Sequence, residues 1–69
     1  MYIEFTDHAK FIMNERGAEE DDIEYILRYP DYIKKSFAER LIAVGKWNKK
    51  PIKIVYVKQE NYIRVLTII

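Results

Sequence analysis

The stretch that decides the fold is residues 39–69, ERLIAVGKWNKKPIKIVYVKQENYIRVLTII. It is rich in β-branched and aromatic residues, which favour strands. Two polar clusters interrupt it, at 48–51 and 59–62, and each has the composition of a turn. We therefore expect three strands at 39–48, 51–59 and 62–69, joined by hairpins, with 32–37 as a fourth strand before them.

Two-residue loops at Lys49-Lys50 and Glu60-Asn61 would fix the register of both hairpins. They would set Trp47 opposite Ile52, Tyr56 opposite Val65 and Val57 opposite Arg64. Both faces of this sheet are apolar in the middle, so we expect helices to cover the face that lacks internal charges. That face would carry Trp47, Tyr56 and Thr67. The other face would present the cations Arg40, Lys46, Lys53 and Arg64.

Upstream of the strands the pattern is helical. Thr6 or Asp7 is the expected N-cap of a helix that runs to Arg16, and Gly17 is its expected C-terminal glycine. A second helix begins in the acidic run 19–22 and ends before Pro30. Residues 1–5 form a possible short first strand. The predicted fold class is α+β, with two N-terminal helices packed on a four-stranded antiparallel sheet.

Length and composition narrow the functional classes. The chain has 69 residues, a single histidine and no cysteine. Cysteine nucleophiles are therefore excluded, and no ligand spacing suggests a metal site or a cofactor. We find no run of eighteen apolar residues and no signal-peptide pattern. The expectation is one domain over residues 1–69 that is cytoplasmic and makes no membrane contact.

The charge is divided along the chain. Residues 1–31 carry nine acidic and three basic side chains, whereas residues 32–69 carry nine basic and two acidic ones. Such asymmetry indicates a polyanion or an acidic partner. Attraction between the two halves within the fold would explain it equally well.

The run DHAKFIMNERGAEEDDIEYILRYPDYI, residues 7–33, resembles a prokaryotic family catalogued as domain of unknown function 4258. The residues that carry the resemblance are His8, Ala9, Met13, Arg16, Gly17, Ile23, Pro30 and Asp31, with Val55, Tyr56, Arg64, Val65 and Thr67 in the closing strands. The chain departs from the family pattern at Ile12, Ala18 and Glu19. That family is similar to the RelE and BrnT toxins, so the resemblance implies a RelE-like fold and a ribonuclease paired with an antitoxin.

Metal-independent RNA cleavage needs a proton acceptor for the ribose 2′-OH, cations for the phosphorane and a proton donor for the leaving oxygen. His8 is the candidate acid or base, because imidazole exchanges protons near neutral pH. Arg64 and Lys46 are the candidate phosphate clamps, and Tyr56 a hydrogen-bond donor to the phosphate. The candidate RNA contacts are Arg16, Arg40, Trp47, Lys49, Lys50, Lys53 and Thr67. A structural histidine, solvated surface cations and core roles for Tyr56, Thr67 and Trp47 are the competing interpretations.

The sequence thus predicts a toxin that cleaves RNA without a metal, with a cognate antitoxin and RNA or the ribosome as partners. The alternative is a non-catalytic module of the same fold that binds a protein or a second copy of itself. A nucleic-acid binder without chemistry is the third hypothesis.

Overall fold

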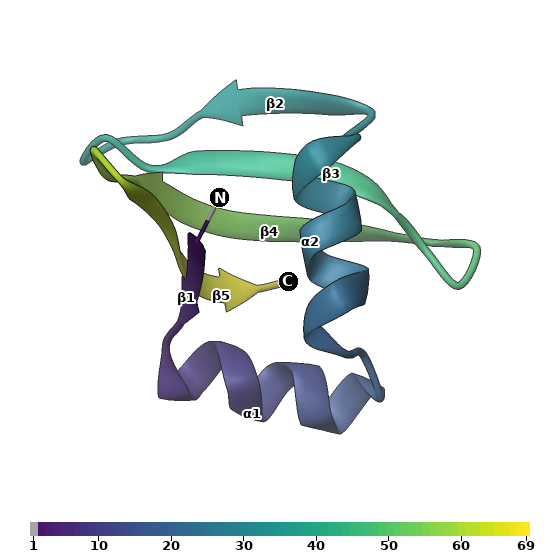
Figure 1. Cartoon of the computed structure of the whole chain (residues 1–69). Coiled ribbons are helices and arrows are strands. Elements are labelled where there is room, and N and C mark those ends of the chain that lie inside the picture. The colour runs from purple at the N-terminus through teal and green to yellow at the C-terminus, as the bar shows by residue number, and fades with distance from the viewer. Residues whose placement is uncertain (1) are drawn as a thin grey trace.

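The computed structural model describes residues 2–69, which form two helices and five strands (Figure 1). Met1, which the predicted strand 1–5 included, lies outside the described residues. In chain order the elements are β1 (Tyr2–Phe5), α1 (Asp7–Arg16), α2 (Glu20–Arg28), β2 (Tyr32–Lys35), β3 (Leu41–Trp47), β4 (Lys50–Lys58) and β5 (Tyr62–Ile68). The α+β class is as the sequence predicts.

The sheet has the strand order β1-β5-β4-β3-β2. The short N-terminal strand is its fifth member, and it pairs in parallel with β5, Tyr2 lying opposite Tyr62. The prediction of four antiparallel strands is therefore corrected to a mixed sheet of five. Two parallel strands are joined by a long connection and not by a tight turn, so no local sequence pattern predicts their pairing.

The first long hairpin turns one residue earlier than predicted. Its two-residue loop is Asn48-Lys49, with φ of 56° and 68°, and Trp47 pairs with Lys50 instead of Ile52. Positive φ at both loop residues defines the type I′ turn, and asparagine tolerates the left-handed region better than most residues. The pairing moves by two residues, so every side chain keeps the face that the prediction gave it.

The second hairpin has the predicted register. Tyr56 pairs with Val65 and Val57 with Arg64. Further along β5 the register shifts, because Val55 pairs with Thr67 and leaves Leu66 as the extra residue of a β-bulge. The shift brings Ile68 into the core and turns Thr67 to the other face. The predicted place of Thr67 on the helix-covered face was wrong for this reason.

Both helices begin and end where the sequence predicts. Thr6 caps α1 by accepting a hydrogen bond from the Ala9 N–H at 3.0 Å, and Gly17 follows in the left-handed conformation with φ of 74°. At the start of α2, the Asp22 carboxylate accepts a 2.9 Å hydrogen bond from the Glu19 N–H. These contacts satisfy amides that the first turn of a helix leaves unpaired.

The helices cover one face of the sheet, with α2 in front of β3 and β4 and α1 beneath β5 (Figure 1). Tyr56 belongs to the core there, and Trp47 packs at its edge. The core consists of Ala9, Met13, Ala18, Ile23, Ile26, Ala43, Ile52, Ile54, Tyr56, Ile63, Val65 and Ile68. We call the opposite side the open face; it presents Ile42, Val44, Lys46, Lys53, Val55, Val57, Arg64 and Thr67.

Candidate functional site

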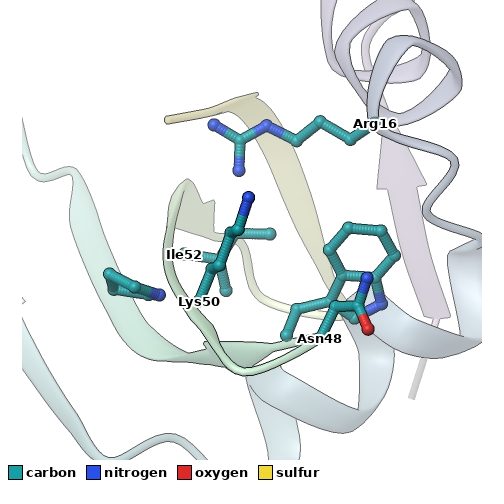
Figure 2. A pocket seen from close by; sticks show the side chains of 6 residues that line it. Arg16, Asn48, Lys50 and Ile52 are labelled. Carbon is teal, nitrogen blue, oxygen red and sulfur yellow. The ribbon is translucent and has the colours of Figure 1, made fainter.

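A cavity of about 590 Å³ lies between the C-terminal end of α1 and the β3–β4 hairpin (Figure 2). It is on the helix-covered side of the sheet. The residues that line it are Arg16, Trp47, Asn48, Lys50, Pro51 and Ile52.

Local structure explains why these side chains meet. Arg16 is the last residue of α1, and Gly17 turns the chain away directly after it. The type I′ turn holds Trp47 and Lys50 as a cross-strand pair on the same side of the hairpin. Ile52, which is 1% exposed, belongs to the core beneath them. The cavity is therefore built on the ends of regular elements and not on a long loop.

Positive charge dominates the cavity. Two of its lining side chains are cations and none is acidic. Within residues 2–69 the ion pairs are Arg28–Glu24 and Arg64–Glu4, so neither lining cation takes part in one. Figure 2 shows the Arg16 guanidinium and the Lys50 ammonium pointing toward each other across the opening. Two facing cations without a counterion favour the binding of an anion.

The residue types suit a phosphate that carries an aromatic group. A guanidinium donates two parallel hydrogen bonds to phosphate oxygens, and an ammonium adds a compact charge. Trp47 is half-buried and offers an indole on which a base can stack. Asn48 adds an amide that donates and accepts hydrogen bonds. The arrangement can hold a phosphodiester next to an unpaired base.

The four predicted catalytic residues lie in separate parts of the structure. His8 is exposed in the first turn of α1, on the helix side of the sheet. Arg64 is on the open face, where its Nε lies 3.0 Å from a carboxylate oxygen of Glu4. Lys46 is exposed on the open face of β3, and Tyr56 is buried in the core, where desolvation raises the pKa of its phenol. The structure does not bring these four side chains together.

The predicted RNA contacts divide into three groups. Arg16, Trp47 and Lys50 share the cavity, and the exposed Lys49 is in the turn beside it. Lys53 and Thr67 are on the open face. Arg40 lines a smaller cavity of about 300 Å³ at the other end of the β3–β4 hairpin, together with Lys35, Ser36, Glu39, Leu41 and Lys58.

Sequence reasoning missed Asn48, Lys35 and Lys58. Asn48 carried one usable signal, because an asparagine before a lysine pair is a favourable first residue of a type I′ turn. No sequence signal pointed to Lys35 and Lys58. They line the same cavity because β2 and β4 both pair with β3.

Within residues 2–69 no group of three or more histidine, cysteine, aspartate or glutamate side chains is placed to hold a metal ion. Neither helix in this part of the chain is long and apolar enough to span a membrane.

The fold and the cavity together define a small α+β domain with a cationic site at the end of a hairpin. Residues 5–69 match the family model described as Domain of unknown function (DUF4258). The match covers nearly the whole chain, so the chain belongs to this family. No curated protein and no solved structure matches it.

Proposed function

We propose that this chain binds single-stranded RNA, with one phosphate of the strand held between Arg16 and Lys50. The observation that carries the proposal is the pair of facing cations beside an indole, in a cavity without an acidic side chain. Single-stranded nucleic acids are recognised by this combination of phosphate contacts and base stacking.

The surroundings of the cavity support the same ligand. Lys49 extends the positive charge along the turn, whereas Lys46 and Lys53 lie on the opposite, open face of the hairpin. A polyanion that enters the cavity therefore meets a further cation on the turn, which increases both its affinity and the rate of encounter.

We extend the proposal to metal-independent cleavage by a toxin with a cognate antitoxin. Its support is the resemblance to the RelE and BrnT toxins. In such a reaction the ribose 2′-oxygen attacks phosphorus and loses its proton to a base. The bond to the 5′-oxygen breaks, and that oxygen takes a proton from an acid, which leaves a 2′,3′-cyclic phosphate. Arg16 and Lys50 would stabilise the phosphorane charge.

Proton transfer needs an acid and a base, and the residues that line the cavity include neither a histidine nor a carboxylate. His8 precedes Arg16 by two helical turns, which corresponds to about 12 Å along α1. The histidine would therefore act only on a strand that follows α1 from the cavity toward the helix N-terminus. Binding is accordingly the first activity to measure and cleavage the second.

Fluorescence anisotropy with a labelled single-stranded RNA tests the binding. We expect Arg16→Gln and Lys50→Gln each to weaken binding and to lower the slope of log affinity against log salt by about 0.7, the value for one phosphate contact on a single strand. Lys34→Gln is the matched control, because it removes an exposed cation from β2, outside the cavity. Equal losses in all three variants would show non-specific attraction and would overturn the proposed site.

Cleavage is tested on the same RNA with and without ribosomes, followed by analysis of the product ends. Cyclic phosphate ends that disappear in Arg16→Gln and in His8→Ala support the proposed reaction. Binding without any cleavage in both conditions would leave an RNA-binding domain and would contradict the nuclease.

Protein binding is the second candidate function, and the open face favours it. Lys46 and Lys53 are exposed there, and neither takes part in an ion pair within residues 2–69. An acidic protein such as an antitoxin is therefore the partner with complementary charge. Co-expression with the product of an adjacent gene, followed by copurification, tests whether such a complex forms. Lys53→Glu should weaken the complex. Lys58→Glu, outside the open face, is the control and should not.

A further inference from the structure

The edge strand β2 is exposed over its whole length. All four of its residues, Tyr32–Lys35, have exposed side chains, although the strand belongs to the sheet. Within residues 2–69 its only neighbour in the sheet is β3, so its other edge is unpaired there. An unpaired edge is a template for a further strand.

Apolar side chains gather around this edge. Eight large hydrophobic residues are exposed in the described part of the chain, and five of them fall within residues 25–37. They are Tyr25, Tyr29, Tyr32, Ile33 and Phe37. The end of α2 leads directly into β2 at the outer edge of the sheet (Figure 1), and the ring centroids of Tyr25 and Tyr29 lie 5.2 Å apart. An exposed apolar group of this kind indicates an interaction surface.

The hydrogen-bond pattern shows which backbone groups face outward. Ile33 lies opposite Ala43, and Ser36 continues the same register because its N–H donates to the Arg40 carbonyl at 2.8 Å. Hydrogen-bonded and non-hydrogen-bonded pairs alternate along an antiparallel ladder. The N–H and C=O groups of Ile33 and Lys35 therefore point away from β3 and toward the unpaired edge.

We propose that β2 pairs with β2 of a second copy of this chain, antiparallel, with the two-fold axis at Ile33. The two sheets would join into one of ten strands. The two Ile33 residues would exchange both of their outward hydrogen bonds, and their side chains would meet on the helix-covered side, where the neighbouring Ala43 is already core.

Charge selects this register over its alternative. With the axis at Ile33, Tyr32 lies opposite Lys34 of the second copy. Lys35 of the second copy then lies beside Asp31, which directly precedes β2 and donates its N–H inward to the Val44 carbonyl at 2.8 Å. Both combinations are favourable across a strand pair, and symmetry makes each of them twice. With the axis at Lys34, the two Lys34 ammonium groups would oppose each other and Ile33 would face a lysine. Lysines on a free edge usually prevent pairing, but here each one has a suitable partner.

The mass in solution gives the first test. Light scattering at increasing protein concentration should approach twice the chain mass of 8.4 kDa. Ile33→Lys should return the protein to a monomer, because it places two ammonium groups on the symmetry axis. Phe11→Lys is the matched control, since it alters an exposed apolar residue on α1, away from β2. A monomer at every concentration overturns the proposal.

A charge swap tests the register. Asp31→Lys alone should weaken the dimer, because it sets two like charges against each other at both ends of the interface. Adding Lys35→Asp should restore the dimer, since the swapped pair is again complementary. A double variant that dimerises no better than Asp31→Lys contradicts the Asp31–Lys35 pairing and thereby the proposal.

Cross-linking gives an independent test, because the chain has no cysteine. Opposed residues in a hydrogen-bonded antiparallel pair have Cα atoms about 5.5 Å apart, within the range that a disulfide spans. Ile33→Cys should therefore form a disulfide-linked dimer under mild oxidation. If Lys34→Cys cross-links and Ile33→Cys does not, the axis is at Lys34 and the proposal is wrong.

Discussion

The hydroxyl of Thr6 donates a 2.8 Å hydrogen bond to the carbonyl oxygen of Leu66, sixty residues further along the chain. The same hydroxyl caps α1, and the Thr6 N–H donates to the Val65 carbonyl at 3.1 Å. Leu66 is the extra residue of the bulge in β5. One side chain therefore joins the start of α1 to the point where the sheet changes register.

The first prediction concerns this side chain. Thr6→Val keeps the shape but removes the cap and the bond to Leu66, and we expect it to lower the free energy of unfolding by about 1–2 kcal/mol. Urea denaturation provides the measurement. Thr6→Ser retains the hydroxyl and should lose much less; equal losses in the two variants would show that the hydroxyl contributes no more than the methyl group and would contradict the prediction.

The second prediction concerns the contact of α2 with β3. A Cβ added at Gly45 would lie 2.9 Å from Cγ2 of the buried Ile26. Gly45→Ala should therefore destabilise the fold by about 1–3 kcal/mol through overpacking. Ile26→Ala removes the clashing methyl group, so the double variant should cost less than the sum of the two single changes. Additive costs would contradict the clash as the cause.

The third prediction is a pH dependence. Burial raises the pKa of the Tyr56 phenol above its ordinary value of about 10. Between the unfolded and folded pKa values the native state holds a proton that the unfolded state has lost. Stability that is fully present below pH about 10 should therefore fall as the pH rises through the folded pKa. Unfolding curves at alkaline pH measure this fall, and Tyr56→Phe should make it shallower; an unchanged profile would contradict the assignment.

The fourth prediction concerns the turn beside the cavity. Lys49 has φ of 68°, a conformation that costs an L-residue with a side chain more than it costs glycine. Lys49→Gly should stabilise the hairpin by about 0.5–1 kcal/mol, because it relieves this strain. Lys49→Val should destabilise it, since β-branched side chains tolerate positive φ poorly. Thermal unfolding compares both variants; stabilisation by valine would be inconsistent with the turn geometry.

Local sequence signals predicted the parts of the fold that local physics determines. An N-cap at Thr6 or Asp7, of which the structure has Thr6, and the glycine at Gly17 follow from capping preferences. The pairing of Tyr56 with Val65 follows from turn length. The partner of β1 did not follow, because it lies sixty residues away and only the complete sheet selects it. The bulge at Leu66 could not be predicted either. Residues 65–69 are largely apolar, so they show no alternation of polar and apolar side chains that an extra residue would interrupt.

The sequence allowed the residues of the candidate site to be predicted, but not their position in the fold. Arginine, lysine and tryptophan were recognised as suitable for RNA, and Arg16, Trp47 and Lys50 share one cavity. Their meeting depends on the end of α1 lying against the first hairpin, which is a matter of packing between distant segments. The opposite faces of Tyr56 and Arg64, in contrast, were predicted correctly, because the second hairpin has the register that its turn length indicates.

The parallel pairing of β1 with β5 has a consequence for how the protein is made. Tyr2 leaves the ribosome sixty residues before its partner Tyr62, so during translation the first strand has no place in the sheet. Both helices can form in the meantime, but the face that they cover is incomplete until the last hairpin has emerged. Contacts of such long sequence separation also slow folding. The nascent chain therefore exposes its apolar residues until synthesis of β5 is complete.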